Sequence, residues 1–245
     1  MAAAATGLLL LTTARCTGGD ATAAAEPTGG PTSTTADPSA PTRTSTPPPS
    51  PADPVSIPAL MERKHTGSNL RLGYTEDVIG AVLALRSSTR AEIDGDRIGL
   101  LGRSMGGGVA YNTLVVAPGL VDAAVVFAPV SSRPAENVDR FRRSDGDPLV
   151  AEIEAAHGTP EENPAFWQEV SPITYADRLS EPLLIHHGTA DDTCPITWSR
   201  QTMAAFKAAG KDVQLKEYEG EGHAFGPQWP ASMETTMDFF AQHLR

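Results

Sequence analysis

The stretch Ile98-Gly99-Leu100-Leu101-Gly102-Arg103-Ser104-Met105-Gly106 decides the fold of this chain. A short apolar run leads directly into the pattern G-x-S-x-G, and a helix-compatible segment follows the serine. Such a strand, tight turn and helix form a nucleophile elbow, which exposes the serine hydroxyl and requires small neighbours. The pattern predicts a strand over 97–101, a nucleophilic Ser104 and a helix over 104–117, whose first N–H groups favour negative charge beside the serine.

A base and an acid for this serine follow later in the chain. A serine hydroxyl becomes a good nucleophile only when a base, usually a histidine oriented by a carboxylate, accepts its proton. In chains with a nucleophile elbow, the expected order along the sequence is serine, then acid, then histidine. Asp191 and Asp192 follow a predicted strand over 182–186, and His223 follows one over 213–218. We predict His223 as the base, and spacing alone leaves both aspartates open as the acid.

The other histidines are weaker candidates for the base. His65 lies in a bridge segment, and His157 and His243 fall at the ends of predicted helices. His186 and His187 end a strand, where packing and hydrogen bonding to the backbone are the ordinary roles of this residue type.

The second half of the chain alternates strands with helices. Segment 133–180 is a long insertion, and a further apolar strand is predicted over 121–127. The alternation predicts an α/β fold in which helices flank a parallel sheet, with right-handed crossovers. The predicted helices besides the one at the elbow span 74–88, 148–156, 164–170, 196–209 and 229–244.

The first 73 residues differ from the rest, because Tyr74 is the first aromatic residue. Residues 1–16 hold a short apolar run and then Cys16, an arrangement similar to a bacterial lipoprotein signal. Residues 17–54 are mostly Thr, Ala, Pro, Ser and Gly, which predicts a disordered tether, and 55–73 form a bridge. We expect a folded domain over 74–245 in an exported chain, secreted or held to a membrane through a lipidated Cys16.

Composition excludes several classes of function. The 245 residues include 30 acidic and 19 basic side chains, a net charge of −11, which argues against a nucleic-acid partner. No apolar stretch approaches the roughly 20 residues that span a bilayer. The two cysteines, Cys16 and Cys194, are too few for a disulfide framework or a four-thiolate zinc site.

Three motifs stand in order along the second half: Gly102-Arg103-Ser104-Met105-Gly106-Gly107, Leu184-Ile185-His186-His187-Gly188-Thr189-Ala190-Asp191-Asp192 and Tyr218-Glu219-Gly220-Glu221-Gly222-His223. Together they resemble the catalytic domain of the prolyl oligopeptidase family of serine peptidases, within the α/β-hydrolase superfamily. The resemblance implies Asp191 as the acid, with Asp192 holding the loop. It implies acyl transfer without metal or cofactor, in which the N–H of Met105 is one oxyanion donor. Cys194, where relatives usually have Val, is expected to be a buried small residue.

The resemblance also implies what this chain lacks. A complete α/β-hydrolase domain has strands before the elbow, and a His-Gly loop after one of them supplies the second oxyanion donor. No strand-like run lies between Val55 and Gly73, and His65-Thr66-Gly67 is the nearest match to that loop. We therefore expect about four parallel strands, with the elbow strand at an exposed edge.

Three functions fit the sequence. The first is a serine peptidase that acts on small peptides, and the second is a carboxylesterase whose pocket Arg133, Phe166 and Trp167 help to shape. The third is a catalytically silent surface or binding protein that keeps the triad residues without a complete oxyanion hole. The oligomeric state is left open.

Overall fold

The computed structural model describes residues 6–11, 70 and 72–244, and residues 6–11 through their backbone only. Cys16, the predicted tether and most of the bridge lie outside the described residues. In the described part, no helix combines the length and the apolar character that a membrane crossing requires.

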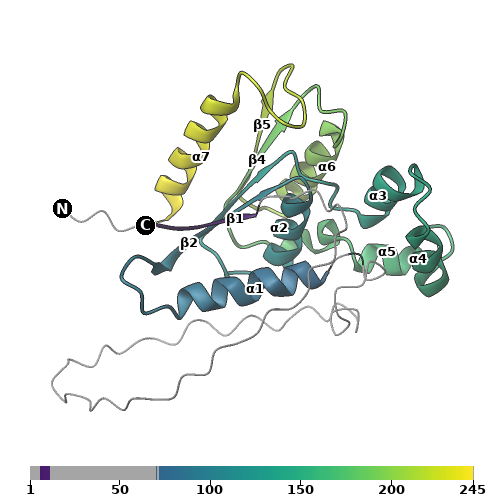
Figure 1. The fold of residues 1–245 in the computed structure, drawn as a ribbon, viewed down its shortest axis with the longest axis horizontal. Helices are drawn as coiled ribbons and strands as arrows, with labels where there is room; N and C mark the ends of the chain where they lie inside the picture. The colour runs from purple at the N-terminus through teal and green to yellow at the C-terminus, as the bar shows by residue number, and fades with distance from the viewer. Residues whose placement is uncertain (1–5, 12–69, 71, 245) are drawn as a thin grey trace, which may run out of the picture. The chain divides into compact units, whose positions relative to one another are not determined.

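A parallel sheet organises the fold (Figure 1). Four of its strands are those expected from the sequence, and they confirm the α/β prediction of a partial parallel sheet with flanking helices. They are β2 (Asp94–Arg103), β3 (Ala123–Phe127), β4 (Leu183–Gly188) and β5 (Val213–Tyr218), paired in that order.

The elbow strand is not at the edge of the sheet, and that expectation was wrong. A fifth strand, β1 (Thr6–Leu11), pairs in parallel with β2 and places Leu8 opposite Gly99 and Leu11 opposite Gly102. Backbone pairing of this kind satisfies N–H and C=O groups that a bare edge would leave open. The same residues form the apolar run of the predicted export signal. A cleaved leader could not supply this strand, so the two roles exclude one another within one molecule.

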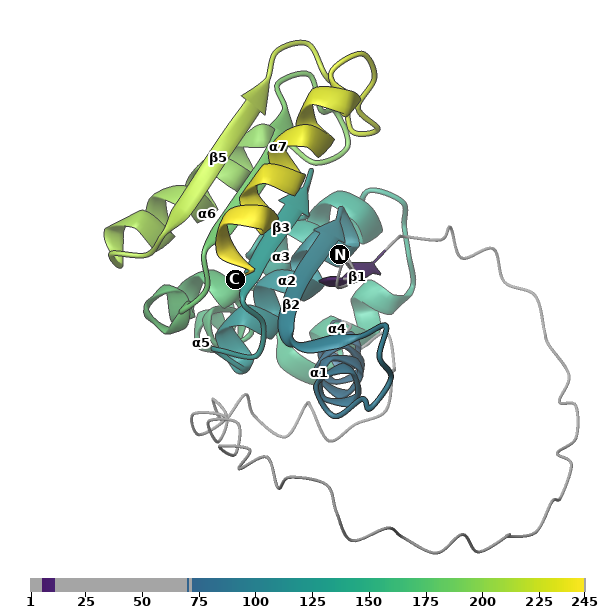
Figure 2. The same ribbon diagram turned by 90° about the vertical axis from the view of Figure 1, so that its left-hand side faces the viewer.

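Helices cover both faces of the sheet (Figure 2). One face packs against α1 (Gly73–Arg86), α2 (Met105–Val116) and α6 (Ile196–Ala208), around side chains such as Leu100, Val126 and Ile185. The other face packs against α7 (Trp229–His243), whose Phe239 and Phe240 meet Leu101, Val125 and Leu184. Because successive strand residues point to opposite faces and both faces are covered, β3 and β4 are buried along their whole length, and β2 is buried over its second half.

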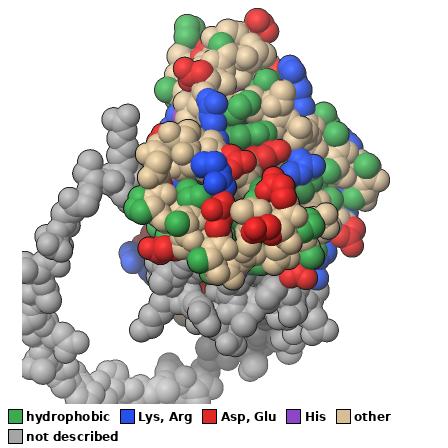
Figure 3. All heavy atoms as spheres, turned by 90° about the vertical axis from the view of Figure 1, so that its right-hand side faces the viewer, with side chains coloured by type: hydrophobic (Ala, Val, Ile, Leu, Met, Phe, Trp, Pro, Cys, Tyr) green, Lys and Arg blue, Asp and Glu red, His purple; other side chains and the backbone are tan. Residues whose placement is uncertain are grey.

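The insertion between β3 and β4 forms a small helical lobe with its own core. Ile153, Phe166 and Trp167 are buried in that core together with Leu72. Acidic and basic side chains are interspersed on the face shown in Figure 3. The sequence predicted two of the helices, α4 and α5, and missed the other three. The five are α3 (Pro134–Val138), the π-helical turn η3 (Asp139–Arg143), α4 (Leu149–His157), α5 (Pro164–Glu169) and the 3-10 helix η4 (Pro172–Arg178).

Candidate active site

Ser104 lies on the strained turn between β2 and α2. Its φ of 54° and ψ of −118° lie outside the regions that residues with a side chain normally adopt. The turn is held from outside, because the N–H of Ser104 donates to the carbonyl of Phe127 at 2.9 Å. Its own carbonyl accepts from the N–H groups of Gly107 at 3.0 Å and Val130 at 3.1 Å. These contacts hold the serine in the conformation that the G-x-S-x-G pattern predicts.

Gly102 explains why the elbow requires glycine. A Cβ atom at this position would lie 2.3 Å from the carbonyl oxygen of Gly106, a backbone atom that cannot move without opening the turn.

Replacing Gly102 by Ala is therefore expected to lower the free energy of unfolding by about 2–4 kcal/mol. Gly80→Ala is the matched control, because nothing lies within 4 Å of a Cβ at this helical position. That control is expected to stabilise the fold by about 0.5–1 kcal/mol. Urea unfolding of both variants measures the difference, and equal midpoints would contradict the proposed constraint.

The structure brings together the three residues predicted for catalysis. His223 Nε2 lies 3.0 Å from Ser104 Oγ, and His223 Nδ1 lies 2.9 Å from Asp191 Oδ2. Since an ionised carboxylate only accepts, Nδ1 carries the hydrogen and Nε2 is left to accept the serine proton. The side chain of Asp191 is fully buried and that of His223 is 19% exposed, so the predicted base reaches the surface and the predicted acid does not.

Asp191 is held as a carboxylate in the loop between β4 and α6. Its Oδ1 accepts the N–H groups of Thr193 at 2.9 Å and Cys194 at 2.8 Å. Burial alone would raise the pKa of Asp191, but hydrogen bonds from His187, His223 and the N–H of Cys194 outweigh it and lower the pKa. The group is therefore charged at neutral pH.

Asp192 is placed differently from its neighbour, and this separates two aspartates that spacing left equivalent. Its side chain is exposed, and its Oδ1 lies 3.3 Å from the hydroxyl of Thr193. Arg140 in the insertion donates to the carbonyl of Asp192. Asp192 thus contributes to the loop, and Asp191 alone of the pair meets His223.

Two residues that the sequence did not single out position the His223 loop. Arg103, next to Ser104, donates from Nη2 to the carbonyl of His223 at 2.8 Å. The buried carboxylate of Glu221 accepts from the N–H groups of Gln228 at 2.7 Å and of Gly226. The carbonyl of Glu221 also accepts the N–H of Ala190 at 3.0 Å, which ties the histidine loop to the acid loop. In the sequence, the glycines that flank Arg103 and Glu221 were the feature that could have drawn attention to these two residues.

Most of the remaining histidines take part in packing or hydrogen bonding away from Ser104. His186 bonds to the hydroxyl of Tyr218 at 2.7 Å, and burial, with a smaller effect of Lys216, lowers the pKa of its imidazole to about 3. His157 stacks on Phe166, and His243 packs beside Phe239 in α7. His65 lies outside the described residues. His187 meets the expected backbone carbonyl, that of Cys194, and also approaches Asp191.

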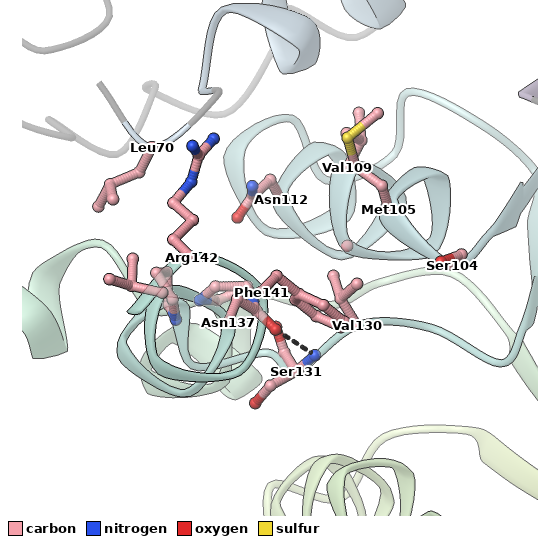
Figure 4. Close-up of a pocket in the computed structure, with 14 residues that line it drawn as sticks. Leu70, Ser104, Met105, Val109, Asn112, Val130, Ser131, Asn137, Phe141 and Arg142 are labelled. Atoms are coloured by element: carbon pink, nitrogen blue, oxygen red, sulfur yellow. Dashed lines mark hydrogen bonds between the residues drawn. The ribbon is translucent and has the colours of Figure 1, made fainter. Parts of the chain in front are cut away.

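A cavity of about 310 Å³ opens beside Ser104, between α2 and the insertion (Figure 4). Ser104 lies at one end, and Val130, Asn137 and Phe141 face α2 across the space. The residues expected to shape a pocket are not among those that line it. Phe166 and Trp167 pack inside the insertion, and Arg133 donates to Gln201 at 2.8 Å. The lining residues are Leu70, Ser104, Met105, Gly108, Val109, Asn112, Val130, Ser131, Pro134, Asn137, Val138, Phe141, Arg142 and Pro172.

Cys194 is a buried small residue in this site, as expected. Burial, reinforced by the charge of Asp191, raises the pKa of its thiol to about 12, so the sulfur is protonated and a poor nucleophile. Within the described residues, no group of three His, Cys, Asp or Glu side chains is arranged to hold a metal ion.

Comparison with known proteins gives both a family and relatives. A model of the prolyl oligopeptidase family matches residues 66–245. The uncharacterized peptidase YuxL of Bacillus subtilis (strain 168) is 33% identical over 131 residues, covering 54% of this chain and 19% of that protein. Dipeptidyl peptidase 4 of Felis catus is 31% identical over 164 residues, covering 65% of this chain and 20% of that protein. The chain thus spans about a fifth of the length of these curated relatives.

Solved structures have the same fold. A puromycin hydrolase mutant matches with a TM-score of 0.52 at 26% identity, covering 69% of this chain and 25% of that chain. Esterase 2 of Thermogutta terrifontis matches with a TM-score of 0.53 at 22% identity, covering 74% of this chain and 68% of that chain. At that identity the esterase shows a likeness of fold alone.

Proposed function

Since this chain belongs to the prolyl oligopeptidase family of serine hydrolases, we propose that it hydrolyses peptide bonds with Ser104 as the nucleophile. One observation carries the proposal: two hydrogen bonds, of 3.0 and 2.9 Å, join Ser104 Oγ through His223 to Asp191 Oδ2. A serine, a base and an acid in this order form the arrangement that activates a hydroxyl for acyl transfer.

The proposed reaction has two halves. Ser104 Oγ attacks the substrate carbonyl while its proton moves to His223 Nε2, and the Asp191 carboxylate stabilises the imidazolium. The N–H of Met105, at the start of α2, donates to the oxyanion. Collapse of the tetrahedral intermediate breaks the C–N bond, and the amine leaves with the proton from His223. Water then attacks the acyl-enzyme by the same route and restores Ser104.

The cavity beside Ser104 is the proposed site for the acyl side chain of the substrate. Its volume of about 310 Å³ is at the lower end for small-molecule pockets, which suits one side chain rather than an extended peptide. Val109, Val130, Val138 and Phe141 give it an apolar wall, so we propose an apolar residue on the acyl side of the cleaved bond.

Chemical labelling tests this function directly. The purified chain is incubated with a fluorophosphonate probe, its intact mass is measured, and the adduct is mapped by tandem mass spectrometry. We expect one adduct per chain, on Ser104. An unmodified mass under conditions that label a control serine hydrolase would contradict the proposal and favour the silent protein. Peptide p-nitroanilides and p-nitrophenyl esters, compared at matched acyl groups, then separate a peptidase from an esterase.

Replacing Phe141 by Ala is expected to change acyl preference, because it removes a ring from the cavity wall. Across a series of acyl p-nitrophenyl esters, kcat/KM for the long acyl groups relative to acetyl should rise about tenfold, the scale of one or two methylene contacts. Phe166→Ala is the matched control, because Phe166 is buried in the insertion core and does not line the cavity. Equal changes of preference in both variants would place the acyl group elsewhere.

A further inference from the structure

A second imidazole approaches the carboxylate of Asp191. His187 Nε2 lies 3.3 Å from Asp191 Oδ2, the oxygen that also meets His223, and 2.8 Å from the carbonyl oxygen of Cys194. Its other nitrogen, Nδ1, lies 2.7 Å from the hydroxyl of Ser199 in α6. The side chain of His187 is completely buried, so each of these contacts takes the place of one with water.

The partners of His187 decide where its hydrogen is. A carbonyl oxygen and an ionised carboxylate only accept, so Nε2 must be the nitrogen that carries the hydrogen. With the hydrogen on Nε2, Nδ1 can accept from the hydroxyl of Ser199. The Cys194 carbonyl, at 2.8 Å, is the hydrogen-bond acceptor of Nε2, and Asp191 Oδ2, at 3.3 Å from the same nitrogen, is the more distant polar neighbour.

We propose that His187 is a positioning residue for catalysis: its Nε2–H holds Asp191 Oδ2 in line with His223 Nδ1 and draws charge from that oxygen. The predicted effect on kinetics rests on the proposed hydrolase function, whereas the predicted contacts of His187 do not depend on it. The direction of the Asp191 pKa agrees with it, because His187 is among the donors that lower this pKa.

The charged and titratable groups around His187 leave Asp191 as the partner that it acts on. Cys194, in the same loop, is a neutral thiol. Glu217 on β5 lies opposite His187 in the sheet register, and its carboxylate is paired with Arg200 of α6 at 2.6 Å. Tyr111 of α2 adjoins Ser199, and burial raises the pKa of its phenol well above the ordinary value. Cys194, Glu217 and Tyr111 therefore keep their charge between pH 5 and 8.

The sign of the effect follows from the charge on Oδ2. Without the Nε2–H of His187, more negative charge remains on the oxygen that faces His223. The imidazolium of His223 is then favoured, and it releases its proton only at higher pH. The acidic limb of kcat/KM against pH should therefore move upward in His187→Phe, by about 0.5–1 pH unit, while kcat falls about tenfold. A residue that only packs would lower stability or kcat without moving that limb.

Three variants separate positioning from packing. His187→Gln keeps a donor towards Asp191 and should restore the wild-type limb. His186→Phe is the matched control, because the adjacent buried imidazole bonds to Tyr218 and Thr236 and to no triad residue. Ser199→Ala keeps the ring but removes its Nδ1 partner, and it should shift the limb in the same direction by a smaller amount. Ser199→Ala also keeps the inference testable if His187→Phe does not fold.

An NMR measurement tests the geometry without turnover. In Ser104→Ala protein labelled with ¹⁵N-histidine, His187 is expected to carry a hydrogen on Nε2. Hydrogen on Nδ1 alone would overturn the inference whether or not the chain is an enzyme. An unchanged acidic limb in His187→Phe would also overturn it, and would leave the hydrolase function standing if the wild type still reacts with the fluorophosphonate. Failure of the wild type to react would instead count against the proposed function, and the tautomer would still decide the geometry.

Discussion

Replacing Ser104 with Ala is expected to reduce kcat by about 10⁶ and to abolish labelling by the fluorophosphonate. In the proposed mechanism the bond to the acyl group forms at Ser104 Oγ, and among the described residues no other hydroxyl is hydrogen-bonded to His223 Nε2. The fold should be retained, since the elbow is held by backbone contacts with Phe127 and Val130.

Ser131→Ala is the control for this prediction, because Ser131 also lines the cavity but its hydroxyl is bonded to Glu136. Its kcat/KM is expected to stay within about tenfold of the wild type, since it makes no contact with the triad. Thermal unfolding of both variants checks that the fold survives. Labelling of the Ser104→Ala protein at another residue would contradict the assignment of the nucleophile.

Replacing Asp191 with Asn is expected to lower kcat by about 10⁴ while leaving the site folded. The two backbone N–H groups of Thr193 and Cys194 require an oxygen where Oδ1 now lies. The amide of the new side chain therefore places its NH₂ group toward His223, which favours the tautomer with hydrogen on Nε2. In that tautomer His223 cannot accept the proton of Ser104.

Asp192→Asn is the matched control for the acid. Asp192 is exposed, and within the described residues its carboxylate accepts a hydrogen bond only from the side chain of Thr193, so kcat/KM should change by less than about tenfold. Steady-state kinetics on one ester substrate compares the two variants. A larger loss of activity in Asp192→Asn than in Asp191→Asn would show that Asp192, and not Asp191, is the acid.

Much of the fold could be predicted because its signals are local. The apolar runs of β2, β3 and β4 are long enough to mark buried parallel strands, and Gly102 and Ser104 identify the elbow through a steric requirement of a few adjacent residues. The strand β1 could not be predicted, because an edge offers backbone groups to any extended segment and composition does not say which one pairs. Three helices of the insertion, α3, η3 and η4, were missed because each spans only five to seven residues, too few to show a helical period.

The sequence by itself determined the class of fold, and it predicted Ser104 as the nucleophile and His223 as the base. Those depend on residue types that few other roles require, set at the ends of recognisable strands. Tertiary structure decided that Asp191 rather than Asp192 faces His223, that Phe141 rather than Phe166 lines the cavity, and that His187 approaches the acid. Each of these depends on which way a side chain points after the chain has turned, and that direction is set by packing between segments far apart in the sequence.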